Sequence, residues 1–183
     1  MVENPFGDVI AYLVLILCFA VGVMFARGKL SHTRRIKTAR RVLKKLQAIE
    51  TPSAQFAYLR KIDPFVFEEL ILEAFHGGGL KIERNRRYTG DGGIDGKVKI
   101  HGRYVLIQAK RYSGYIDNKD IDVFSRLCEK NGLLGLFIHT GKTGKGSYRK
   151  KSGEVDIVSG SRMLDLILGR SFSPKWRTQR DWF

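Results

Sequence analysis

The chain has 183 residues, two cysteines that lie far apart, four scattered histidines and a formal net charge of +15. This length accommodates one domain of ordinary size plus an additional segment, and such a domain holds its core without disulfide bonds. The charge favours polyanionic partners, either nucleic acid or an anionic membrane surface, and the cysteine spacing excludes a CxxC-type zinc site.

The first predicted element is a transmembrane helix over residues 9–26. This stretch, VIAYLVLILCFAVGVMFA, contains no charged residue, and its helical length of about 27 Å is close to the hydrocarbon thickness of a bilayer. A cleaved signal peptide would have a basic front region, whereas Glu3 and Asp8 precede this stretch. A buried core helix is the remaining alternative.

A basic amphipathic helix is predicted over residues 27–50, directly after the apolar stretch. This segment is rich in Lys and Arg and has no acidic residue before Glu50. Because positive residues flank membrane spans on the cytoplasmic side, the segment predicts a single-pass protein of the inner or cytoplasmic membrane. Its N-terminus would lie outside and its remainder in the cytoplasm. Apolar residues recur in it at helical spacing. Two roles stay open for the charges, contact with anionic lipid headgroups and contact with DNA.

The remaining elements alternate between helices and strands. Thr51-Pro52 and Asp63-Pro64 each predict a helix N-terminus, with an N-cap followed by proline, and the second helix ends at three glycines, 77–79. The elements that follow are strands 80–84, 94–100 and 103–110, a helix 118–130, strands 135–140 and 154–158, and a helix 162–168. For the basic, aromatic segment 171–183, packing, phosphate binding and fraying all stay open.

Polar side chains converge on the predicted hairpin of residues 94–110. His101-Gly102 suits a two-residue turn, so Ile100 faces Arg103, and the same register sets Asp95 opposite Gln108. Lys110 lies two residues beyond Gln108 and shares its face. A plain Asp95–Lys110 ion pair is one explanation. Two features favour a functional site instead. The glycine-rich segment GDGGIDG before the hairpin leaves room for the backbone of a ligand. The residues Lys110-Arg111-Tyr112 at the end of the hairpin suit a phosphodiester.

Oxygen ligands are what a hard divalent cation prefers, and this hairpin offers them. We predict a metal site formed by Asp95, the side-chain oxygen of Gln108 and the backbone carbonyl of Ala109. Lys110 would polarise an attacking water or stabilise charge on a phosphate. The preceding helix adds an acid, either Glu68 or Glu69.

The motifs Phe67-Glu68, Asp91-x-Gly93-Ile94-Asp95-Gly96 and Gln108-Ala109-Lys110-Arg111-Tyr112 resemble those of the Mrr-like restriction endonuclease family, in the PD-(D/E)xK nuclease superfamily. The resemblance covers residues 63–140. It implies an α/β fold, a restriction-endonuclease-like αβββαβ core with a central mixed sheet. The N-terminal transmembrane helix predicted before this core is a departure from the family. It also implies DNA cleavage with Mg²⁺ or Mn²⁺ and assigns Glu68, Asp95, Gln108 and Lys110 to the catalytic site. Gln108 replaces the usual acid of the superfamily, as in other Mrr-like members.

The sequence thus predicts an N-terminal segment 1–26, a linker helix 27–50, a nuclease domain 51–170 and a tail 171–183. The expected function is a membrane-anchored, metal-dependent DNA endonuclease that acts in restriction of foreign DNA or in mobile-DNA processing. The alternative is a non-catalytic, membrane-tethered DNA-binding or scaffold protein with a nuclease-like fold.

Further expectations concern DNA contacts and assembly. The predicted DNA-binding residues are Arg111, Tyr112, Lys142, Lys145 and Arg149, the last three in a basic loop that fails the phosphate-binding-loop pattern. His139 is expected to be structural. Double-strand cleavage favours a homodimer by symmetry, while RNA or junction DNA stay open as substrates.

Overall fold

The computed structural model describes residues 5–85, 93–144, 146–147 and 153–176. Their elements are α1 (Pro5–Gln47), α2 (Pro52–Leu59), α3 (Pro64–Gly77), β1 (Ile82–Arg84), β2 (Gly96–Ile100), β3 (Arg103–Lys110), α4 (Asn118–Asn131), β4 (Gly135–His139), β5 (Val155–Val158) and α6 (Gly160–Ile167). The predicted αβββαβ order followed by a strand and a helix is confirmed.

The five strands form one mixed sheet in the order β1-β2-β3-β4-β5, and the α/β fold with a mixed sheet is confirmed. β1, β2 and β3 are antiparallel neighbours, whereas β3, β4 and β5 run parallel. α4 provides the connection that parallel β3 and β4 require. The C-terminal ends of β3 and β4 therefore lie at the same edge of the sheet, with Lys110 beside His139.

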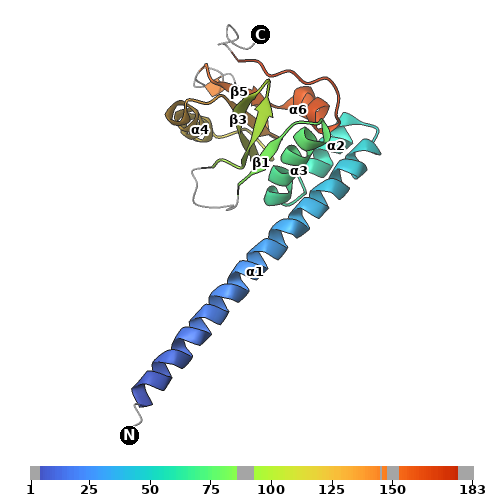
Figure 1. Ribbon diagram of the computed structural model, residues 1–183. Helices are drawn as coiled ribbons and strands as arrows, with labels where there is room; N and C mark the ends of the chain where they lie inside the picture. The colour runs from blue at the N-terminus through green and yellow to red at the C-terminus, as the bar shows by residue number, and fades with distance from the viewer. Residues whose placement is uncertain (1–4, 86–92, 145, 148–152, 177–183) are drawn as a thin grey trace.

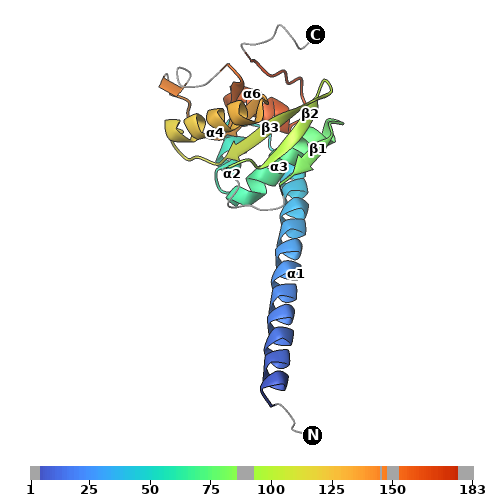
Figure 2. The ribbon, with the colours of Figure 1, turned by 60° about the vertical axis from the view of Figure 1, so that its left-hand side comes forward.

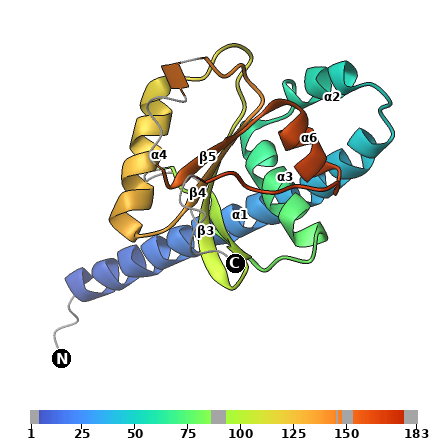
Figure 3. The same cartoon turned by 90° about the horizontal axis from the view of Figure 1, so that it is seen from above.

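Helices cover both faces of the sheet, as Figure 3 shows from above. On one face, α3 and α6 pack against the odd-numbered residues of β3, Val105, Ile107 and Ala109. On the other face, α4 packs against Leu106 and Phe137 through Phe124 and neighbouring side chains. Residues of β3 with even numbers, including Gln108 and Lys110, therefore point to the α4 side.

The long helix α1 belongs to the domain only in its C-terminal part. Ala39, Val42 and Leu46 recur at helical spacing and are buried in the same core as α3. Gln55 caps this end of α1, because its amide donates to the carbonyls of Leu46 and Ile49 at 3.1 and 2.8 Å. The rest of α1 runs away from the domain in both Figure 1 and Figure 2.

In the part of the chain that the structure describes, no helix is both long enough and apolar enough to cross a membrane. The transmembrane helix predicted over residues 9–26 therefore finds no support there. The backbone of this range is helical, as part of α1, but the side chains of residues 5–11 and 22–29 lie outside the described set.

The C-terminal segment packs on the domain as far as residue 176. The Trp176 indole N–H donates to the Gly135 carbonyl at 3.1 Å, and the Lys175 N–H donates to the buried carboxylate of Asp156 at 2.7 Å. Arg162 of α6 also holds Asp156, at 2.6 Å. Of the three possibilities left open by the sequence, packing holds for this part of the segment, and residues 177–183 lie outside the described residues.

Candidate active site at the ends of β2 and β3

The hairpin register predicted from the sequence is confirmed. His101 and Gly102 both have positive φ, 46° and 82°, as a two-residue hairpin turn requires. Ile100 faces Arg103, and the pairing continues without a break to Gly96 opposite Ile107. Asp95 and Gln108 are the next residues on the two strands.

Asp95 leaves the ladder at this point and turns its carboxylate toward β3. Its N–H donates to the Ile107 carbonyl at 2.9 Å, and its Oδ2 accepts from the Ala109 N–H at 2.6 Å. Asn85 holds the backbone of residues 94–95 in place. Its side chain donates to the Ile94 carbonyl at 2.8 Å, and its N–H donates to the Asp95 carbonyl at 3.1 Å. The acid is thus held against the Gln108-Ala109-Lys110 segment.

Gln108 is buried, with 4% of its surface exposed. Its amide lies against Gly93, where an added Cβ would come within 2.5 Å of the Gln108 Nε2 atom. Gly93 also has φ +95°, so a side chain there would be strained as well as crowded. Among the described residues, the Gln108 Oε1 atom has no hydrogen-bond partner. This leaves a buried oxygen acceptor unsatisfied one residue before Ala109, whose N–H binds Asp95.

Lys110 forms an ion pair with Asp120, a residue that the sequence analysis did not single out. The Lys110 Nζ lies 2.6 Å from Asp120 Oδ1, and the Tyr112 hydroxyl donates to Asp120 Oδ2. Burial, with the hydrogen bond to Asp120, raises the pKa of Tyr112, which keeps this hydroxyl protonated as a donor. Asp120 lies in the first turn of α4, after the Asp117 N-cap, and it holds the Lys110 ammonium in position.

Glu68 is the acid of α3 that lies near Asp95. Burial, followed by the negative charge of Asp95, raises the pKa of Glu68 to about 8, although Arg35 of α1 acts in the opposite direction. The two carboxyl groups are therefore close enough to interact electrostatically. With a pKa of about 8, Glu68 is mostly protonated at neutral pH.

Glu69 has a different environment from Glu68. This difference decides which of the two acids belongs to the candidate site, a choice that the sequence spacing alone left open. Glu69 is buried and pairs with Arg84 at 3.0 Å and with His32 of α1 at 3.3 Å. Glu73, one turn further on, is held by Arg84 and, at 2.7 Å, by Arg40 of α1. These two buried acids fasten α3 to α1 and β1, whereas Glu68 faces Asp95.

The predicted DNA-binding residues have different surroundings. Arg111 donates to the Arg60 carbonyl at the C-terminal end of α2, and Tyr112 is held by Asp120, so both have partners within the protein. Lys142 is exposed. Lys145 and Arg149 lie outside the described residues.

His139 is fully buried at the end of β4. Burial lowers its pKa to about 4, so the ring is neutral at pH 7. Its Nδ1 accepts from the Gly141 N–H at 3.1 Å, which leaves the ring proton on Nε2 for Thr143 Oγ1, also at 3.1 Å. The Thr143 hydroxyl also forms a hydrogen bond with the Ser159 hydroxyl at 3.0 Å. This chain of hydrogen bonds agrees with the structural role expected for His139.

The donor set fits a hard divalent cation. Asp95 contributes a carboxylate, and the unpaired Oε1 of Gln108 contributes a buried amide oxygen. Among the described residues, no three His, Cys, Asp or Glu side chains gather as a metal-binding group. The predicted ligand set contains only one residue of those four types, Asp95, and draws its other oxygens from Gln108 and Ala109.

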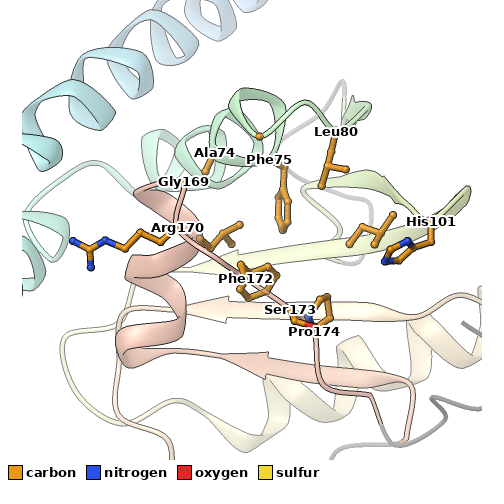
Figure 4. Close-up of a pocket in the computed structure, with 12 residues that line it drawn as sticks. Ala74, Phe75, Leu80, His101, Gly169, Arg170, Phe172, Ser173 and Pro174 are labelled. Atoms are coloured by element: carbon orange, nitrogen blue, oxygen red, sulfur yellow. The ribbon is translucent and has the colours of Figure 1, made fainter. Parts of the chain in front are cut away.

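A cavity of about 430 Å³ lies elsewhere, between α3, α6, the β2–β3 turn and the segment that follows α6. Figure 4 shows Phe75 and Phe172 in its wall and His101 at one end. His101 precedes β3, so the cavity is at the opposite end of this strand from Lys110. It brings together none of the predicted site residues. We therefore assign the chemistry to the Asp95–Lys110 end of the sheet.

The chain matches the model of a known protein family. A family model described as a restriction endonuclease, the Mrr catalytic domain, matches residues 59–167. This range is more than half of the chain and includes α3, the five strands and α4. No curated protein matches the chain, and no solved structure matches it either.

Proposed function

Because the chain belongs to the Mrr-like family of restriction endonucleases, we propose that it hydrolyses phosphodiester bonds in DNA with the help of Mg²⁺ or Mn²⁺. The observation that carries this proposal is the end of β3, where the Asp95 carboxylate is held by the Ala109 N–H, between Gln108 with its buried, unpaired amide oxygen and Lys110. The net charge of +15 adds a general attraction for DNA phosphates.

Each residue has a distinct role in this proposal. Asp95, the Gln108 side-chain oxygen and the Ala109 carbonyl would hold the ion, whose chemistry is to lower the pKa of a bound water and to neutralise phosphate charge. Lys110, oriented by Asp120, would stabilise the negative charge that develops on the scissile phosphate as water attacks phosphorus and the P–O bond to the leaving sugar oxygen breaks. Glu68, which is mostly protonated at neutral pH, would act as a proton donor near Asp95.

Membrane anchoring is a separate proposal, and it is supported by two observations. Residues 9–26 carry no charge. Between Tyr12 and Val21, large apolar side chains are exposed on all sides of α1, including Leu17 at 64% and Phe19 at 75%. Such a surface is costly in water and would be covered by acyl chains. An anchored enzyme would act on DNA near the membrane, in restriction of foreign DNA or in mobile-DNA processing.

The function is tested by cleavage of plasmid, linear and methylated DNA with the full chain in Mg²⁺, Mn²⁺ or EDTA. Asp95→Ala should abolish cleavage, and EDTA should do the same to the unmodified protein. Asp165→Ala is a matched control, since Asp165 is a partly exposed acid of α6 that pairs only weakly with Arg170, at 3.5 Å. DNA binding without cleavage under any ion would instead support the non-catalytic tethering function. Equal cleavage by Asp95→Ala and the control would refute this site.

A further inference from the structure

Two loops meet at the sheet edge that bears Lys110, and they are fastened to each other by their backbones. The loop after β3 contributes Gly114, Tyr115 and Ile116, and the loop after β4 contributes Lys142. The Lys142 N–H donates to the Gly114 carbonyl at 2.8 Å, and the Ile116 N–H donates to the Lys142 carbonyl at 3.1 Å. Tyr115 and Lys142 are paired as an isolated parallel bridge.

The contact between these loops is close and leaves little freedom. A Cβ on Gly141 would lie 2.6 Å from the Gly114 carbonyl oxygen and 2.7 Å from the Tyr112 Cβ atom, so only glycine fits there. Thr140 adds a second connection, because its hydroxyl accepts from the Tyr112 N–H at 3.0 Å and donates to the Tyr112 carbonyl at 2.7 Å. The backbone of Tyr115 is therefore held in place.

The Tyr115 side chain, in contrast, is open to solvent. It is 71% exposed, and the Lys142 ammonium lies 5.8 Å from the centroid of its ring. Tyr115 follows Lys110 by five residues, so at most about 18 Å of chain separates them. An exposed aromatic ring on a well-held backbone, with an adjacent cation, thus lies within a few nucleotides of the proposed scissile phosphate.

We propose that Tyr115 and Lys142 form a stacking site for an unpaired base of the substrate strand. The ring offers the base a flat surface, and Lys142 offers the adjoining phosphate a positive charge. In a paired duplex the faces of internal bases are covered by their neighbours, so the site selects DNA that is single-stranded or locally opened beside the cleavage position. This inference rests on the proposed function for the identity of the substrate as DNA, and it names the class of DNA.

Binding in EDTA tests the stacking site independently of cleavage. The full chain is titrated with a single-stranded oligonucleotide that contains 2-aminopurine and with the matched duplex, and both fluorescence quenching and affinity are measured. Tyr115→Ala should weaken single-strand binding about tenfold and remove the quenching, while duplex binding changes less than about twofold. Tyr115→Phe should behave as the unmodified protein, because it keeps the ring.

Tyr104 provides the matched control at the opposite end of β3. Its ring also lies beside a lysine, Lys99, at 5.9 Å, but its hydroxyl is bound to Glu83. Tyr104→Ala should leave single-strand binding and quenching unchanged. The stacking site is refuted if Tyr115→Ala has no effect, if it weakens single-strand and duplex binding equally, or if Tyr104→Ala causes the same loss. Absence of cleavage on every DNA would refute the nuclease function, whereas this binding comparison would still decide the stacking site.

Discussion

The surroundings of Glu68 raise its pKa, and this shift makes the stability of the folded protein depend on pH. Its pKa of about 8 in the folded protein is above the ordinary value of about 4.3. As the pH rises from about 4 to 8, the unfolded chain loses this proton first, so the folded state loses stability across that range. Above pH 8 both states are ionised, and the full cost of the buried charge is present.

Glu68→Gln should therefore stabilise the fold relative to the unmodified protein at pH 9. The gain should shrink toward zero as the pH falls to about 4, because glutamine cannot ionise. Thermal unfolding in EDTA from pH 5 to 9 measures this trend, with the exposed Glu50→Gln as control. A stability difference that does not vary with pH would contradict the assigned pKa.

His139 has the opposite dependence on pH. Its pKa of about 4 in the folded protein is below the ordinary value of about 6.5, so acidification through this range favours the unfolded state, which binds the proton more tightly. The loss is on the order of 2 kcal/mol between pH 7 and pH 5. Urea unfolding at the two pH values should show this loss in the unmodified protein and a smaller loss in His139→Gln. Equal losses would place the acid sensitivity elsewhere.

At the scale of elements, the C-terminal part of α1 acts as a core helix. Leu46 is fully buried between α1 and the domain, whereas Leu30 of the same helix is 57% exposed. Leu46→Ala should destabilise the protein by about 2–5 kcal/mol, and Leu30→Ala should change stability by less than about 0.5 kcal/mol. Urea unfolding of the two variants measures both effects. Equal stability of the two variants would mean that α1 does not contribute to the cooperative unit.

The elements themselves could be predicted from the sequence because their signals are local. The bounds of β3 follow from an apolar run after His101-Gly102, and both proline-initiated helices begin where their N-caps predict. The hairpin register follows from the turn length alone, and it brings Asp95 to the segment of β3 that begins at Gln108. This part of the site was therefore predictable.

The partners of the charged residues were not predictable, because they depend on packing between distant elements. Asp120 reaches Lys110 only because α4 packs on the face of the sheet to which the Lys110 side chain points, and nothing in the spacing of the two residues indicates this. The choice between Glu68 and Glu69 depends on which face of α3 meets α1 and β1, where Arg84 and His32 engage Glu69. In both cases the local sequence gives the residue type but not its neighbour.

For the whole molecule, the distribution of charge and apolar surface separates two regions. Residues 1–26 carry no basic residue, and the excess of positive charge lies in the remainder of the chain. The described apolar side chains of α1 from Tyr12 to Val21 are exposed, while Ala39, Val42 and Leu46 are buried in the domain. One end of the molecule thus favours an apolar environment and the other a polyanion.

The central claim is that the Lys110 end of the sheet cleaves DNA, and single-turnover plasmid cleavage in Mg²⁺ tests it most directly. The unmodified full chain is compared with Lys110→Ala and with Lys119→Ala, which removes an exposed lysine of α4 one residue from Asp120. We expect Lys110→Ala to lower the cleavage rate at least about a hundredfold with little change in DNA affinity, since one charge-stabilising group of this kind is worth that much, and Lys119→Ala to keep its rate. Equal rates for the two variants would contradict the claim, because cleavage would then not depend on the residue at the centre of the proposed site.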